Sequence, residues 1–261
     1  MKALLLAALL APLSCVLAQE AQDEKPLPEE LAITRSITLQ DADEFQSSAD
    51  FRFFKFHDQK QITAAAELEY GLTDRWELDA EVPYQFVNPN AARAANGIGD
   101  VEVATRYGVI PVGEKPLALD VGLAVGIPTG DRLHDLGEGR LTLEPFFTAS
   151  TWLGPLNVQL NGGWQRAVTD AGEEPRDDFE YNVALVYPIK HWFLALEGNG
   201  ESNHDRTLYY VTPELIWKPR KNLEFLVAVP IGVTGAAADY GIVTSVTLEF
   251  DNITHRGIDK D

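Results

Sequence analysis

The sequence predicts an all-β fold, an antiparallel transmembrane β-barrel of about twelve strands. Two observations predict it. From about Phe45 to Phe250, successive segments of about ten residues alternate apolar and polar side chains, which is the pattern of strands with an apolar outer face and a polar inner face. The connections between these segments are alternately short and long. Bacterial barrels combine short periplasmic turns, longer outer loops and an even strand number, so we expect a barrel in a Gram-negative outer membrane.

The first eighteen residues have the organisation of a secretory signal peptide. Met1-Lys2 is a short basic start, residues 3–13 are apolar but too short to span a bilayer, and Val16-Leu17-Ala18 supplies small residues for cleavage before Gln19. A retained anchor helix and a lipoprotein modified at Cys15 are the alternatives. Because Cys15 is the only cysteine, cleavage leaves a mature chain that can form no disulfide.

Residues 19–44 precede the first barrel strand. They are acidic and contain Pro26 and Pro28, so we expect a mobile periplasmic N-terminal extension. Residues 31–39 do alternate in polarity, however, and this leaves an additional strand or a plug in the lumen as the alternative.

The barrel is expected to occupy residues 45–250 as one domain, followed by an acidic tail at 251–261. Turn residues such as Gly, Pro, Asp and Asn mark the short connections. The expected strands are 45–56, 61–70, 76–86, 98–108, 117–127, 141–152, 156–166, 179–188, 191–201, 207–217, 223–233 and 240–250.

Aromatic residues gather at the ends of the expected strands. Amphipathic rings favour the headgroup level, so this placement predicts two girdles at the membrane surfaces, whereas a soluble β-sandwich would use the same rings as core. Trp152 and Phe146 do not fit the parity of their strand, and a bulge near Pro145 would account for both. The expected girdle residues are Tyr70, Trp76, Tyr84, Phe86, Tyr107, Trp152, Phe179, Tyr181, Tyr187, Trp192, Trp217 and Phe250.

The inward faces carry the main concentration of chemistry. A turn at 71–75 sets a register in which Tyr70 faces Trp76, Glu69 faces Glu77 and Glu67 faces Asp79; continued onward, it puts Arg52 beside Ala65 and near Glu81. Three interpretations stay open: a structural Glu–Arg network, a conduit that favours cations, or a divalent-cation site. The expected lumen-facing residues are Arg52, Glu67, Glu69, Glu77, Asp79, Glu81, Asp100, Glu102, Arg106, Asp120, Glu144, Glu180, Glu197 and Glu214.

Three motifs resemble a known family. Residues 70–84 (YGLTDRWELDAEVPY), 97–107 (GIGDVEVATRY) and 126–131 (GIPTGD) occur in the order found in the outer-membrane family "MetA-pathway of phenol degradation". The resemblance covers nearly all of the mature chain and implies a barrel transporter that takes up aromatic compounds. It also implies recognition of a terminal Phe by the barrel-assembly machinery, although here Phe250 is followed by the tail.

These features favour a passive channel for small solutes, in contact with outer-membrane lipid. The net charge of -19 argues against nucleic acid or anionic lipid as a partner. We expect no cofactor, no metal site among the five scattered histidines and no enzymatic activity, because no nucleophile motif is present. A plugged barrel acting as a structural protein or an anchored enzyme is the alternative, and a soluble ligand-binding β-protein is a third.

Overall fold

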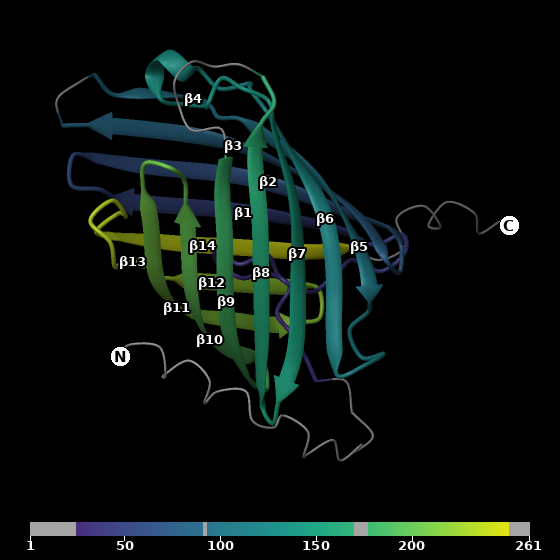
Figure 1. Ribbon diagram of the computed structural model, residues 1–261. Coiled ribbons are helices and arrows are strands. Elements are labelled where there is room, and N and C mark those ends of the chain that lie inside the picture. The colour runs from purple at the N-terminus through teal and green to yellow at the C-terminus, as the bar shows by residue number, and fades with distance from the viewer. Residues whose placement is uncertain (1–24, 91–92, 170–176, 251–261) are drawn as a thin grey trace, which may run out of the picture.

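The computed structural model describes residues 25–90, 93–169 and 177–250, which form one closed antiparallel barrel (Figure 1). The predicted signal peptide and acidic tail lie outside the described residues. The strands are β1 (Phe45–Lys55), β2 (Gln59–Thr73), β3 (Trp76–Pro89), β4 (Ala95–Ile98), β5 (Val101–Ile110), β6 (Leu117–Ile127), β7 (Thr142–Leu153), β8 (Leu156–Ala167), β9 (Asp177–Ile189), β10 (Trp192–Ser202), β11 (Thr207–Arg220), β12 (Leu223–Ala228), β13 (Ile231–Gly232) and β14 (Tyr240–Phe250).

The wall of the barrel has twelve strand positions. Two positions are each shared by two strands: β3 pairs with both β4 and β5, and β12 and β13 both lie between β11 and β14. The barrel closes through β1 and β14, which pair continuously from Phe45↔Phe250 to Lys55↔Tyr240. Closure leaves no free sheet edge, as a membrane-spanning sheet requires. The predicted fold class is therefore confirmed.

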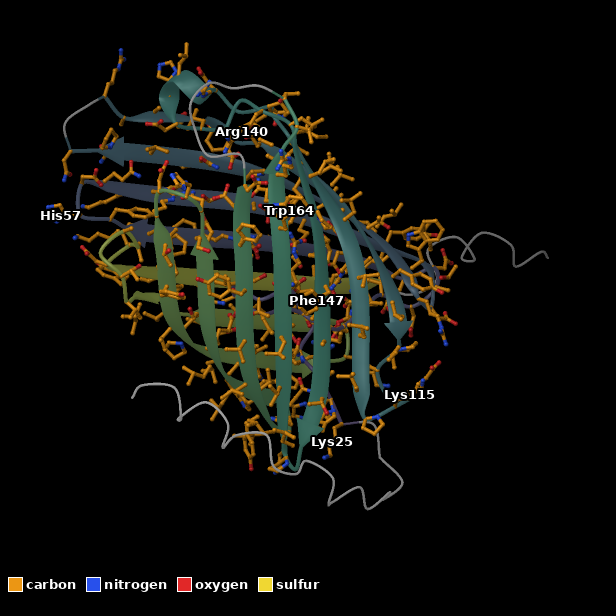
Figure 2. All side chains as sticks on the ribbon, viewed as in Figure 1. Lys25, His57, Lys115, Arg140, Phe147 and Trp164 are labelled. Atoms are coloured by element: carbon orange, nitrogen blue, oxygen red, sulfur yellow. The ribbon has the colours of Figure 1, made fainter. Side chains whose placement is uncertain are left out.

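The two ends of the barrel differ in the length of their connections. The short-turn end carries turns at 74–75, 111–116, 154–155, 190–191 and 221–222, whereas the long-loop end carries the connections after β1, β3, β6, β8, β10 and β12. Lys115 and His57 lie at these opposite ends (Figure 2). The strand boundaries thus follow the predicted alternation closely.

The connection between β6 and β7 contains a short 3-10 turn, η1 (Arg132–His134). Asp131 caps this turn and pairs with His134, with 2.7 Å between Oδ2 and Nδ1. The hydrogen bond from His134 lowers the pKa of Asp131 below its ordinary value. Within the described residues, no helix is long and apolar enough to cross a membrane.

The hairpin of β2 and β3 differs from the predicted register. β2 continues to Thr73, a bulge lies between Gly71 and Thr73, and the turn consists of Asp74 and Arg75 alone. The extra paired residues move the register by two positions. The observed pairs are Glu69↔Asp79, Glu67↔Glu81, Tyr70↔Leu78 and, in the neighbouring hairpin, Arg52↔Thr63.

The predicted bulge at Pro145 is also absent. β6 and β7 pair without a shift from Leu117↔Thr151 to Gly126↔Thr142. Phe146 is buried and faces inward, opposite Gly122, whose missing side chain leaves room for the ring. Trp152 has the same parity, and its ring lies 4.9 Å from Nζ of Lys25. Trp152 therefore does not belong with the outward-facing girdle.

The other predicted girdle residues lie on the outer face. All except half-buried Tyr70 are exposed in the isolated barrel, as lipid-facing rings should be. Sequence reasoning missed Trp164, an exposed ring on β8 that is paired with Phe179 of β9 (Figure 2). The rings thus occupy both ends of the outer wall.

We predict that Leu78→Arg lowers the free energy of unfolding by about 2–4 kcal/mol, because a charge on the lipid face is costly at mid-bilayer. Leu78 alternates with buried Glu77 and Asp79 and is 40% exposed on the outer face. Urea unfolding of protein folded into vesicles measures the effect. Leu133→Arg is the matched control, because Leu133 is 91% exposed on a loop and should lose almost nothing. Equal losses would show that Leu78 does not face lipid.

Candidate functional site

Residues 25–44, the plug segment, lie inside the barrel at the short-turn end. Backbone N–H groups of the segment donate hydrogen bonds to side chains of five different strands. Glu29 and Glu30 donate to Glu224 on β12, at 3.2 and 3.1 Å. The remaining donors are Ala32 to Glu214 (3.2 Å), Ile33 and Thr34 to Glu197 (3.1 and 2.6 Å), Ile37 to Gln159 (2.9 Å) and Gln40 to Glu77 (2.7 Å).

For residues 25–44, these contacts favour the alternative of a lumen plug over a mobile periplasmic extension, and residues 19–24 lie outside the described residues. The segment has no β partner, so its backbone donors need other acceptors once water is excluded. Inward-facing carboxyl groups and the side-chain amide of Gln159 supply them. The acidic lumen therefore binds this chain's own N-terminal segment.

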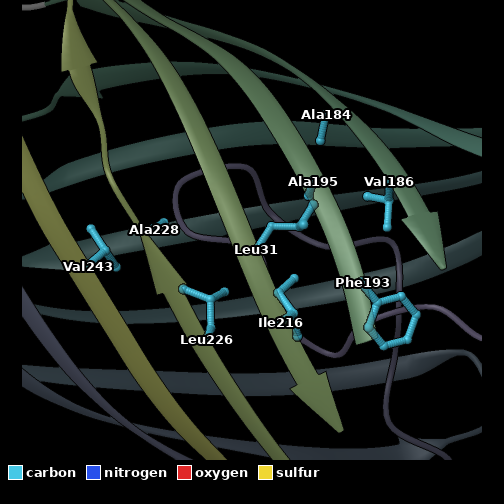
Figure 3. Close-up of a cluster of buried hydrophobic side chains, with 9 residues drawn as sticks. All are labelled: Leu31, Ala184, Val186, Phe193, Ala195, Ile216, Leu226, Ala228 and Val243. Carbon is cyan, nitrogen blue, oxygen red and sulfur yellow. The ribbon is translucent and has the colours of Figure 1, made fainter. Parts of the chain in front are cut away.

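Leu31 anchors the plug segment to an apolar area of the inner wall. It is 7% exposed and packs among inward-facing residues of β9, β10, β11, β12 and β14 (Figure 3). Burying one leucine contributes about 1.5–3 kcal/mol, so the anchor matters to docking. The residues that surround Leu31 are Ala184, Val186, Phe193, Ala195, Ile216, Leu226, Ala228 and Val243.

Arg35 bridges the plug segment and the opposite wall. Its guanidinium lies 3.2 Å from Glu102 on β5 and 3.3 Å from Glu144 on β7. The same group stacks over the ring of Phe146, 4.4 Å from the ring centre. Two predicted lumen acids are thus paired with a cation that the plug segment supplies.

Arg106 and Glu77 form the most buried ion pair among the described residues. The guanidinium contacts Glu77 at 2.6 Å, and the Glu77 carboxylate is fully buried. Arg106 also donates to the carbonyl oxygens of Ser36 (2.6 Å) and Thr38 (3.1 Å). The pair therefore fixes the second half of the plug segment, while the neighbouring Gln40 amide donates to Glu69.

Arg52 forms a separate network nearer the long loops. It pairs with Glu81 at 2.6 Å and with Asp50 at 2.7 Å, so its predicted nearness to Glu81 is confirmed despite the shifted register. Glu67 belongs to two groups of three acids whose carboxyl oxygens lie within 4.8 Å of one another, one with Glu30 and Glu69 and one with Asp50 and Glu81. The second group already contacts Arg52, which supplies the positive charge.

The structure places the predicted lumen residues on the inner side of the wall but in different roles. Glu77, Glu197 and Glu214 bind the plug backbone, whereas Asp120 accepts from the backbone of Thr148 at 3.0 Å. Asp100 accepts from the loop amides of Gly130 (2.9 Å) and Glu138 (2.6 Å) and so organises the long-loop end. Within the described residues, Asp79, Glu67 and Glu180 accept no hydrogen bond.

Sequence reasoning missed several residues that bind the plug segment. Glu224 on β12 and Gln159 on β8 both face inward by the alternation of their strands, and both are almost fully buried. Lys218 on β11 contacts Glu29 and Glu249, the latter at 3.0 Å. Extending the inward parity along β8, β11 and β12 predicts that Gln159, Lys218 and Glu224 face the lumen. Nothing in this pattern indicates that they bind the plug segment.

Among the described residues, two cavities open within the lumen. The outer cavity, of about 810 Å³, lies at the long-loop end and is lined by residues such as Arg52, Glu81, Glu102 and Glu180, with carboxylates outnumbering arginines nine to four. The inner cavity, of about 700 Å³, lies at the short-turn end and is lined in part by residues 37–39 of the plug segment. Arg35 reaches the outer cavity through its pair with Glu102.

The chain matches the family described as the MetA-pathway of phenol degradation over residues 39–250. It belongs to this family. None of the curated proteins compared with it matches.

The fold is shared with solved outer-membrane channels. The COG4313 outer membrane channel from Pseudomonas putida F1 has a TM-score of 0.64 at 14% identity, covering 88% of this chain and 99% of that one. The KdgM porin has a TM-score of 0.53 at 13% identity, with coverage of 78% and 98%. The NanC porin has a TM-score of 0.55 at 11% identity, with coverage of 79% and 99%. These likenesses show a shared barrel fold.

Proposed function

We propose that this chain is a passive outer-membrane channel for small solutes, exported through a cleaved signal peptide and closed by its own plug segment. The single observation that carries the proposal is a closed barrel with one cavity at each end of its lumen, shared in fold with channels and porins. The short-turn end faces the periplasm and the long-loop end faces outward. The same neighbours favour transport over catalysis.

The acidic outer cavity supports a preference for cations. Low-dielectric walls focus the field of lumen charges, so an excess of carboxylates enriches cations over anions. Glu81 and Glu102 are paired with arginines, whereas Glu180 forms no ion pair among the described residues and lines the same cavity. The KdgM porin has been solved in complex with disordered oligogalacturonate. The excess of carboxylates in the present cavity disfavours an acidic sugar of that kind.

The family name and the inner wall together support aromatic or hydrophobic compounds as solutes. The apolar residues around Leu31, such as Phe193 and Ile216, face the lumen, and Phe193 also lines the inner cavity. Displacement of Leu31 would expose an apolar surface next to the polar cavities. Folding of the chain into the membrane would proceed through the barrel-assembly machinery, as the closed barrel requires insertion of every strand.

We predict that Glu180→Gln lowers the cation-to-anion permeability ratio, measured as a shift of reversal potential toward zero under a salt gradient in planar bilayers. Raising the salt concentration should weaken the preference of the parent, because ions screen the lumen field. Glu114→Gln is the control, since Glu114 carries the same charge on an exposed turn outside the lumen. A parent channel without any cation preference would contradict the proposal.

A permanently plugged barrel that serves as a structural protein or anchors an enzyme is the second candidate. The plug segment favours it, because hydrogen bonds fix the segment to several strands of the wall at the short-turn end. This candidate predicts no conductance in the parent. It also predicts a loss of stability, without a gain of conductance, when the lumen acids are replaced.

A further inference from the structure

Two neighbouring turns at the short-turn end carry positive charge at the mouth of the inner cavity, whose lining also includes Glu29 and Glu249. Lys190 in the β9–β10 turn and Arg220 and Lys221 at the β11–β12 turn are exposed, and we call these three residues the basic turn patch. The turns lie side by side, because the Lys218 amide donates to the carbonyl of His191 at 2.8 Å. Within the part of the chain that the structure describes, no acid forms an ion pair with the patch.

The other turns at this end are electrically balanced. The β2–β3 turn holds Asp74 and Arg75, and the β5–β6 turn holds Glu114 and Lys115. Arg75 and Glu114 pair across these turns at 2.5 Å. The β7–β8 turn, Gly154-Pro155, has no charged residue of its own, and Nζ of Lys25 donates a hydrogen bond to its Gly154 carbonyl. Apart from Lys25, the positive charge of the short turns that no ion pair offsets lies at the ends of β9–β12, in a chain whose net charge is -19.

A stack of aromatic rings lies on the outer wall beside the patch. Trp192 and Trp217 are parallel, with ring centres 5.4 Å apart, and Trp217 stacks on Phe225 at 5.5 Å. Trp192 and Trp217 are exposed on the outer face. Above them, Leu194 and Leu215 continue an exposed apolar track along the same strands. Aromatic rings between basic and apolar residues mark the headgroup level of a bilayer.

We propose that the basic turn patch and the Trp192–Trp217–Phe225 stack bind one class of ligand, an anionic phospholipid in the leaflet at the short-turn end. The phosphate oxygens accept hydrogen bonds from Arg220 and the two lysines, and the acyl chains lie along the apolar track. The net charge predicted no anionic lipid partner, but charge acts locally because salt screens it within about 8–10 Å. The proposal rests on the proposed placement of the short turns at the periplasmic leaflet.

The test uses the full mature chain in detergent, incubated with equal amounts of phosphatidylglycerol and phosphatidylethanolamine. Native mass spectrometry then measures how much of each lipid the protein retains. We expect the parent to retain phosphatidylglycerol preferentially. The variant Lys190→Gln/Arg220→Gln/Lys221→Gln should weaken that retention at least about tenfold, since each basic residue adds to the attraction. The matched control Arg75→Gln/Lys115→Gln removes two charges from the other turns and should retain the parent's preference.

Three results would overturn the proposal. Equal retention by the parent and the triple variant would show that the patch is not the site. Complete competition by inorganic phosphate at millimolar concentration would assign the patch to a free anion instead of a lipid. Binding of the parent, but not the variant, to purified peptidoglycan with no lipid preference would assign it to that polymer. Conductance of the triple variant is measured in parallel, so failure of the lipid site and failure of the channel are distinguishable.

Discussion

Deleting residues 25–38 should raise the single-channel conductance several-fold in planar bilayers. The deletion removes Leu31, Arg35 and the backbone donors to Glu224, Glu214, Glu197 and Gln159, so water and ions can fill the short-turn half of the lumen. The strands of the wall remain intact, because the deletion ends before β1 begins at Phe45. Slower migration after heating checks that the variant still forms a closed barrel.

A synthetic peptide of residues 25–38 supplies the control for this deletion. Added to the side of the short turns, it should restore the low conductance, whereas a scrambled peptide of the same composition should have no effect. Addition to the long-loop side should act more weakly, since the segment docks from the other end. An intact deletion barrel with the parent's conductance would show that the segment does not close the lumen.

Replacing Arg106 with Ala should lower the free energy of unfolding by about 3–5 kcal/mol, because the change leaves a buried carboxylate without its partner. Glu77 is 0% exposed, and Arg106 also binds the carbonyl oxygens of Ser36 and Thr38. The variant therefore loses part of the plug docking as well. Urea unfolding in vesicles gives the stability, and bilayer recording of the same sample gives the conductance, which should rise.

Two further variants distinguish the effect of breaking the buried ion pair from the effect of removing an arginine anywhere in the chain. Arg106→Met/Glu77→Gln removes both charges and should recover much of the stability. Arg75→Ala breaks the exposed pair with Glu114 and should cost about 1 kcal/mol or less. If Arg106→Ala cost no more than Arg75→Ala, the Arg106–Glu77 pair would not be shielded from water.

The barrel wall was predictable because its signals are local. Alternation along a strand such as β3 assigns Trp76 and Leu78 to one face and Glu77 and Asp79 to the other, whatever the rest of the chain does. Register depends on the detailed shape of each turn, however. No residue type between Gly71 and Thr73 signals a bulge in the sequence. The pairing of Glu69 with Asp79, which the bulge causes, was therefore not predicted.

The plug segment was not predictable to the same degree. Its docking depends on contacts between residues far apart in sequence, such as Thr34 with Glu197 and Leu31 with Ile216. A signal did exist in Phe193 and Ile216, apolar residues at inward positions that need cover in a water-filled lumen. The alternating apolar residues at 31–39 can cover these positions. Neither the inward apolar residues nor the alternation at 31–39 identifies the other as its partner, however.

Amide hydrogen exchange of the folded protein in vesicles tests most directly whether the lumen carboxylates hold the plug segment. We expect slow exchange at the hydrogen-bonded amides of this segment, comparable to the barrel strands, because each amide is paired inside the lumen and its hydrogen bond is buried or partly buried. These amides belong to Glu29, Glu30, Ala32, Ile33, Thr34, Ile37 and Gln40. Exchange of residues 25–44 at the rate of an unstructured peptide, while the strands stay protected, would contradict it.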